Sequence, residues 1–197
     1  MKAKIILFLF LVSQCTALAA LPFSSTNVRV EDLPSPYHAL MQQPLMTLSI
    51  EKYYQRRALL HKINSHWDKK TNIYSRTIIM LIDNNKKRNK VKIAKEHKTA
   101  LIVELAFIKI NFNALPEAIK KKILYTDLPL GKLLAMNKIA TSSRERSYFA
   151  VKCEGFIAKK LPCVQGSLIY GRHNTLVRKS NGVWLAKVVE ILSGIPS

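Results

Sequence analysis

The chain has 197 residues, of which 48% are hydrophobic, and its 32 Lys and Arg against 12 Asp and Glu give a net charge of +20. This hydrophobic content excludes a largely disordered chain and is enough for one domain with a real core. The positive charge favours an anionic partner, which can be a small anionic metabolite, a nucleic acid or an anionic membrane surface.

The first 20 residues have the pattern of a secretory signal peptide. Lys2 and Lys4 precede an unbroken apolar run over residues 5–12, and residues 17–20 include the small side chains of a cleavage site. The run is too short to predict a membrane span. We therefore expect export to the periplasm or the medium without a stable membrane anchor. An uncleaved N-terminal anchor and a misassigned start are the alternatives, and in the second case the protein is cytoplasmic.

A lead-in over residues 21–44 follows, rich in proline, with one helical turn expected at 37–41. The main domain is predicted to cover residues 45–197. It begins with a short helix over 48–56, for which Thr47 is a plausible N-cap.

Two strands are predicted next, at 57–67 from alternating apolar and polar residues and at 73–82 from β-branched residues. Arg76 lies inside the second strand, where an unpaired buried cation costs on the order of several kcal/mol. We therefore expect Arg76 either to face solvent or to pair with an anion. The lysine-rich residues 83–99 contain no aromatic side chains for base stacking and no helical apolar face for a membrane, which favours a solvated hairpin or loop.

The rest of the chain continues this mixture of strands and helices. The predicted elements are a strand at 100–112, helices at 115–125 and 129–137, and strands at 139–154, 164–179 and 183–192. Asn181-Gly182 is a strong hairpin signal before the last strand. The fold class is therefore α+β, an antiparallel sheet of about six strands with short helices packed on it.

Two cysteines, Cys153 and Cys163, remain after the expected signal peptide. Export would allow a disulfide between them, whereas two free thiols are the alternative, because two cysteines make no disulfide framework. Neither cysteine has neighbours at zinc-ligand spacing, and the five histidines show no such spacing, so no metal site is expected. The sequence also has no Gly-rich phosphate loop and no nucleophile elbow.

Six short segments carry a resemblance to a known family: residues 45–47, 74–79, 114–119, 128–134, 170–172 and 189–192. In this order and at these spacings they resemble the chorismate pyruvate-lyase (4-hydroxybenzoate synthetase) family, including its mycobacterial-type branch. The resemblance implies an antiparallel sheet with helices on it, enclosing a small buried ligand pocket. It also implies conversion of chorismate to 4-hydroxybenzoate and pyruvate without a metal or organic cofactor.

The resemblance further implies which residues contact the substrate. Met46 and Leu130 would give backbone contacts to the ring carboxylate, and Arg76 would pair with that carboxylate through its guanidinium. Glu190 would lie near the ether oxygen and, as a protonated acid in an apolar pocket, would donate a proton to it. Arg76 and Glu190 are thus the expected catalytic residues.

One position departs from the pattern of the family. Many bacterial members have a second arginine where spacing from Pro129 places Phe107 in this chain. Lys109 lies two residues further on, on the same face of the strand, and is the expected replacement cation in substrate binding.

Three functions agree with the sequence. The first is a chorismate lyase. The second is an exported, non-catalytic binding module for a small aromatic carboxylate on the same fold. The third and least favoured is a secreted factor that acts on polyanions through its basic surface. The expected partner is a small anionic aromatic metabolite, and no nucleic acid partner is expected.

Overall fold

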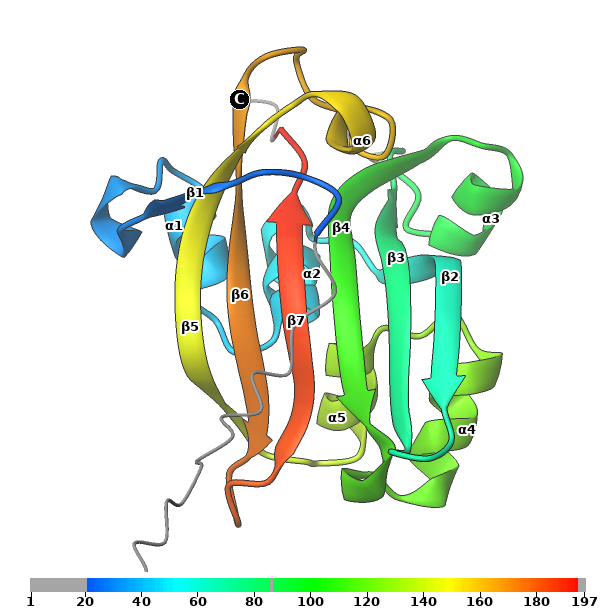
Figure 1. Cartoon of the computed structure of the whole chain (residues 1–197). Helices are drawn as coiled ribbons and strands as arrows, with labels where there is room; N and C mark the ends of the chain where they lie inside the picture. Colours follow the sequence, from blue (N-terminus) through cyan, green and yellow to red (C-terminus); the bar gives the residue numbers. More distant parts are fainter. Residues whose placement is uncertain (1–20, 86, 195–197) are drawn as a thin grey trace, which may run out of the picture.

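A seven-stranded antiparallel sheet runs through the computed structural model, which describes residues 21–85 and 87–194 (Figure 1). The strands are β1 (Thr26–Val28), β2 (Ala58–Asp68), β3 (Ile73–Asp83), β4 (Ala100–Asn111), β5 (Thr141–Lys152), β6 (Leu168–Arg178) and β7 (Trp184–Leu192). Their order in the sheet is β1-β5-β6-β7-β4-β3-β2. Two meanders, β2-β3-β4 and β5-β6-β7, therefore meet where β4 pairs with β7. The α+β class is confirmed, with seven strands instead of six.

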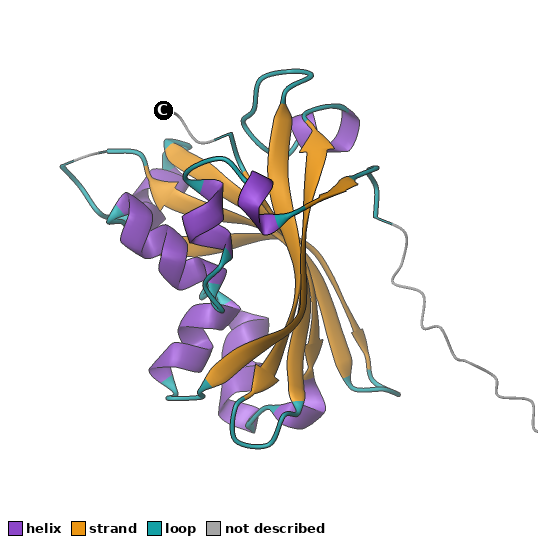
Figure 2. Ribbon diagram, turned by 90° about the vertical axis from the view of Figure 1, so that its left-hand side faces the viewer, coloured by secondary structure: helices purple, strands orange, loops and turns teal. Residues whose placement is uncertain are grey.

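Short helices pack on both faces of this sheet (Figure 2). They are η1 (Val30–Asp32), α1 (Tyr37–Met41), α2 (Met46–Tyr54), α3 (Val91–Glu96), η2 (Phe112–Ala114), α4 (Glu117–Tyr125), α5 (Leu130–Met136) and α6 (Gly155–Ala158). The helices α1, α2, α4 and α5 cover one face, called the helix face below. The helix α6 packs on the opposite face, called the outer face.

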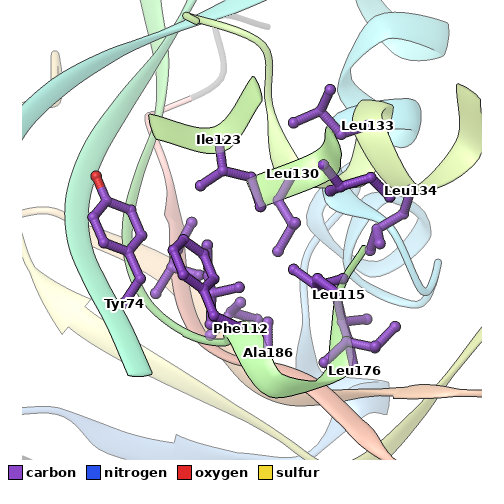
Figure 3. Packing of buried hydrophobic residues seen from close by; sticks show 14 of the residues in the cluster. Tyr74, Phe112, Leu115, Ile123, Leu130, Leu133, Leu134, Leu176 and Ala186 are labelled. Carbon is purple, nitrogen blue, oxygen red and sulfur yellow. The ribbon is translucent and has the colours of Figure 1, made fainter. Parts of the chain in front are cut away.

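Successive side chains of each strand point to opposite faces of the sheet, so the sheet has a hydrophobic layer on each face. On the helix face, Ile123 of α4 and Leu134 of α5 pack over Phe112 and the middle of the sheet (Figure 3). On the outer face, Ile157 of α6 packs with Leu105 and its neighbours. Within the described residues, no helix has the length and apolar character needed to cross a membrane. The expected signal peptide lies outside these residues.

The lead-in is more ordered than its prolines suggest. The helical turn predicted at 37–41 is confirmed as α1, and residues 26–28 add β1 to the sheet beside β5. Tyr37 and Met41 are buried in the hydrophobic core between the helices and the helix face of the sheet. Because these side chains fill the same core as the main domain, residues 21–44 are part of one packed unit.

Two local predictions are wrong. The helix α2 begins at Met46, its N-cap is Leu45 with no capping side chain, and Thr47 is buried in its first turn. The basic residues 83–99 contain the helix α3 and not only a loop or hairpin. This segment is held to the sheet by the buried carboxylate of Asp83, which accepts hydrogen bonds from the Arg88 side chain.

Cys153 and Cys163 form a disulfide, with their Cα atoms 6.0 Å apart. Of the two alternatives left by the sequence, the structure therefore has the bonded pair. The bridge ties the end of β5 to the loop before β6 and closes the segment that carries α6.

Gly171 allows the middle strands to approach closely, and its replacement by alanine should destabilise the fold. A Cβ atom at this position would lie 2.4 Å from Cζ of Phe149 and 2.7 Å from the backbone oxygen of Glu190. Because one of these atoms belongs to the backbone of β7, the strand itself must shift, and we expect G171A to lower the free energy of unfolding by about 1–3 kcal/mol. Urea unfolding measures the loss.

The matched control is Gly194→Ala. A Cβ atom on Gly194 would meet no atom closer than 3.7 Å, which is ordinary contact distance. G194A should therefore change the free energy of unfolding by no more than about 0.5 kcal/mol. Equal losses in the two variants would contradict the close approach at Gly171.

Candidate functional site

A small internal cavity lies between the helix face of the sheet and the first turns of α2 and α5. Its volume is about 30 Å³. Met46, Arg76, Leu130 and Glu190 all line it, although they come from α2, β3, α5 and β7. The structure thus brings together four of the five residues that the sequence predicted for the substrate site.

The register of the sheet explains how Arg76 and Glu190 meet. Arg76 is the pairing partner of Ile108 on β4, and Glu190 is the partner of Ala106 on the same strand. Residues two apart on a strand point to the same face, so both charged side chains project toward the helices. Since β7 lies between β6 and β4, Glu190 is in the centre of the sheet and not at an edge.

The helices α2 and α5 both begin at the cavity, and no side chain caps the first turn of either one. Gly131 permits their close approach, because a Cβ atom there would lie 3.2 Å from Oγ1 of Thr47. Met46 and Leu130 occupy first-turn positions, where backbone N–H groups have no acceptor within their own helix. These N–H groups are therefore suited to an anionic ligand oxygen.

The guanidinium of Arg76 is buried without a partner. Only 3% of the residue is exposed, and its Nε, Nη1 and Nη2 atoms have no hydrogen-bond partner among residues 21–85 and 87–194. Burial lowers the pKa of Arg76 to about 10, so the side chain still carries its charge at neutral pH. Neither expected alternative holds, because Arg76 neither faces solvent nor pairs with an anion of the described chain.

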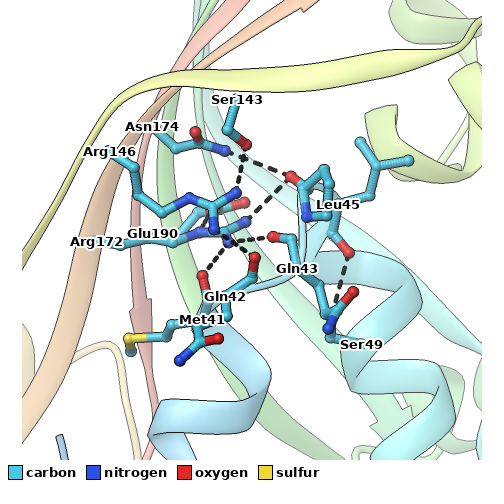
Figure 4. A network of polar contacts seen from close by, with 11 residues as sticks. Met41, Gln42, Gln43, Leu45, Ser49, Ser143, Arg146, Arg172, Asn174 and Glu190 are labelled. Atoms are coloured by element: carbon cyan, nitrogen blue, oxygen red, sulfur yellow. Dashed lines mark hydrogen bonds and ion pairs between the residues drawn. The ribbon is translucent and has the colours of Figure 1, made fainter. Parts of the chain in front are cut away.

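A second buried arginine, Arg172, pairs with Glu190 (Figure 4). Its Nε donates to Oε2 of Glu190 at 2.6 Å. Its Nη1 donates to the backbone oxygen of Met41 at 2.5 Å and also to that of Gln43, and its Nη2 reaches the oxygen of Pro44 at 3.4 Å. Arg172 therefore fixes both the carboxylate of Glu190 and the connection between α1 and α2.

Glu104 belongs to the same cluster of buried ionisable residues as Arg76, Arg172 and Glu190. The sequence analysis did not select it. It is 1% exposed, lines the cavity, and has an Oε2 atom without a hydrogen-bond partner in the part of the chain that the structure describes. Burial raises the pKa of Glu104 well above its usual value, and the adjacent Glu190 carboxylate raises it further. With this raised pKa Glu104 is a candidate for the proton donor, whereas the carboxylate of Glu190 is held by Arg172 in an ion pair. The proton-donor role predicted for Glu190 stays a prediction.

Lys109 does not reach this cavity. The pairing of Arg76 with Ile108 places even-numbered positions of this part of β4 on the helix face, so Phe107 and Lys109 point to the outer face. Both line a groove there, which Arg76 also borders. The side chain of Lys109 is therefore on the other face of the sheet from the Arg76 guanidinium, and Lys109 is not a replacement cation for that site. The prediction that Phe107 and Lys109 share a face is correct.

Glu104→Gln should flatten the dependence of stability on pH. Since the pKa of Glu104 is raised on folding, the unfolded chain loses its proton first as pH rises above about 4.5. The wild type should then lose about 1.4 kcal/mol of unfolding free energy per pH unit, until the folded carboxyl ionises. Urea unfolding between pH 5 and 8 should show E104Q gaining on the wild type as pH rises. Parallel profiles would mean that Glu104 is ionised in the fold.

The described residues contain no group of three or more His, Cys, Asp or Glu side chains that could hold a metal ion. The chain matches no protein-family model, and a search of curated proteins gives no match.

Proposed function

We propose that this protein binds chorismate with the ring carboxylate at Arg76 and converts it to 4-hydroxybenzoate and pyruvate. The observation that best supports this function is the unpartnered guanidinium in a largely apolar cavity. A buried cation without a counter-charge is costly, and its presence is explained if an anion binds there. The planar guanidinium matches a carboxylate, and the N–H groups of Met46 and Leu130 would complete its hydrogen bonds.

In this proposal Glu104 and Glu190 move the protons. The ring C–O bond to the enolpyruvyl group breaks, the hydroxyl-bearing ring carbon loses its hydrogen, and the released enolpyruvate takes up a proton to become pyruvate. Neutral Glu104 would donate to the departing group, and ionised Glu190 would accept the proton from the ring. The pair holds one proton before and after the reaction, so protons balance. Aromatisation drives the reaction, and the protein mainly orients the substrate.

The ring can enter only if the cavity enlarges. A volume of about 30 Å³ holds little more than a water molecule, whereas a benzene ring needs roughly 150 Å³. Pro44, Leu45, Met46 and Thr47 form the helix-side wall. In the proposal this wall moves outward when substrate binds.

The second candidate is binding of an aromatic carboxylate without turnover. The ion pair between Arg172 and Glu190 favours this function, because Oε2 of Glu190 already accepts a hydrogen bond from the buried guanidinium at 2.6 Å and is not free to take a proton from the ring. The site would then be a receptor in which Arg76 alone recognises the ligand charge.

Chorismate turnover and 4-hydroxybenzoate binding separate the candidates. Equal release of pyruvate and 4-hydroxybenzoate from chorismate, measured by a coupled assay and by absorbance, supports the enzyme. Calorimetric binding of 4-hydroxybenzoate without pyruvate release supports the receptor. In both cases Arg76→Met should abolish the signal, while Arg57→Met, which removes an exposed arginine, should not. A protein that neither binds nor reacts would overturn both functions.

A further inference from the structure

A groove of about 610 Å³ crosses the outer face of the sheet, behind the cavity of Arg76. Its floor is formed by β2, β3, β4, β7 and β6, and Leu21 and Pro22 lie along its margin. The volume is in the range of small-molecule sites, which is about 300–1,000 Å³. The proposed function makes no use of this groove.

Strand register arranges the floor in two rows that run across the strands. The first row is mostly apolar at its centre and consists of Asn64, Thr77, Phe107, Val189 and His173. The second row is polar and consists of His66, Ser75, Lys109, Lys187 and Thr175. Members of the two rows are two residues apart on each strand, so the rows lie about 7 Å apart.

The centre of the polar row holds two cations without a counter-charge. Lys109 and Lys187 are direct pairing partners on neighbouring strands, where like charges repel each other. Neither forms an ion pair within residues 21–85 and 87–194. Among the described lining residues only Glu145 has a carboxylate, and it accepts a hydrogen bond from Oγ1 of Thr175 at 3.0 Å. The two ammonium groups are therefore available to one external anion.

The neutral row beside the lysines suits a flat apolar body. Phe107 is half-buried and presents an aromatic side chain that also packs near the rings of Phe23 and Phe156, and the buried Val189 lies directly opposite it on β7. Burial lowers the pKa of His173 at the end of this row, so its imidazole is neutral at pH 7 and adds no further cation. A ligand that uses both rows must carry its charge within about 7 Å of its apolar part.

We propose that this groove is a second binding site, for a compact aromatic anion whose carboxylate, sulfonate or phosphate group lies between Lys109 and Lys187 and whose rings lie on Phe107. Charge complementarity sets the class of ligand, and the short distance between the rows sets its compactness. Arg76 borders both this groove and the helix-face cavity, but strand register directs its side chain to the helix face. The proposed second site uses Lys109 and Lys187 and does not depend on the proposed function.

Two dyes that differ only by one sulfonate test this site. They are 8-anilinonaphthalene-1-sulfonate and the uncharged N-phenyl-1-naphthylamine, titrated by fluorescence into the whole protein. The wild type should bind the sulfonate more tightly by about 5- to 30-fold, the range expected for two partly exposed ion pairs. In K109Q/K187Q this ratio should fall to about one, with binding of the uncharged dye unchanged.

A matched control removes two other charges, in K121Q/K122Q on the exposed side of α4, and should keep the wild-type ratio. The exposed Lys187 also allows the single K187Q variant, which has little effect on folding and should lower the ratio part of the way. A sulfonate preference that survives K109Q/K187Q, or that is absent from the wild type, would overturn the proposal.

Discussion

Arg76→Met is expected to make the ligand-free protein more stable while it abolishes binding of 4-hydroxybenzoate. The residue is 3% exposed and its three guanidinium nitrogens have no partner within the described residues, so folding removes their hydration without replacement. Methionine fills a similar volume without a charge. Replacing buried charges by hydrophobic side chains has stabilised other proteins by about 1–4 kcal/mol, and we expect a gain in this range. Urea unfolding and calorimetry measure the two effects.

The opposite signs of these two effects make the test selective. Arg57→Met removes an exposed arginine and should leave stability within about 0.5 kcal/mol and binding unchanged. If R76M instead lost more than about 1 kcal/mol of stability, Arg76 would be a structural residue with a partner in solution. If R76M still bound 4-hydroxybenzoate, the anion site would not be at Arg76.

Arg172→Met should have the largest destabilising effect of any substitution in the cluster, about 3–5 kcal/mol. It leaves the carboxylate of Glu190 buried next to Glu104 without its cation. It also removes the donor to the backbone oxygens of Met41 and Gln43, which join α1 to α2. Urea unfolding at pH 7 measures the loss.

A double-mutant cycle shows how much of this loss comes from the stranded charge. In the background of R172M, Glu190→Gln removes the uncompensated carboxylate, so R172M/E190Q should recover at least about 1 kcal/mol. In the wild type, E190Q alone should be destabilising, because it leaves Arg172 without its counter-ion. Strictly additive effects would contradict a direct pair.

The central strands could be predicted within one residue because their signal is local. The strand predicted at 73–82 is β3, and the strand predicted at 100–112 is β4. In contrast, β1 is three residues long and is a strand only because it pairs with β5. The helix α3 buries only Val91 and Ala94, so the basic segment around it shows no apolar period. Both elements depend on tertiary contacts that the sequence does not display.

The candidate site could be predicted in part for a similar reason. A cation within the apolar strand at 73–82 identified Arg76, and the same reasoning applied to the strand at 100–112 would have identified Glu104. The prediction for Lys109 was wrong because the sequence does not show which residues of β4 lie on the same face of the sheet as Arg76 of β3. That depends on the register between the two strands. Only the pairing of Arg76 with Ile108 reveals that Lys109 points away.

The junction of β4 with β7 has a consequence for dynamics. Arg76 belongs to the first meander and Glu190 to the second, so a molecule held by both would link the two halves of the sheet across this seam. Opening of the seam would then require release of the ligand, and occupancy should slow amide hydrogen exchange along β4 and β7 more than at the outer strands.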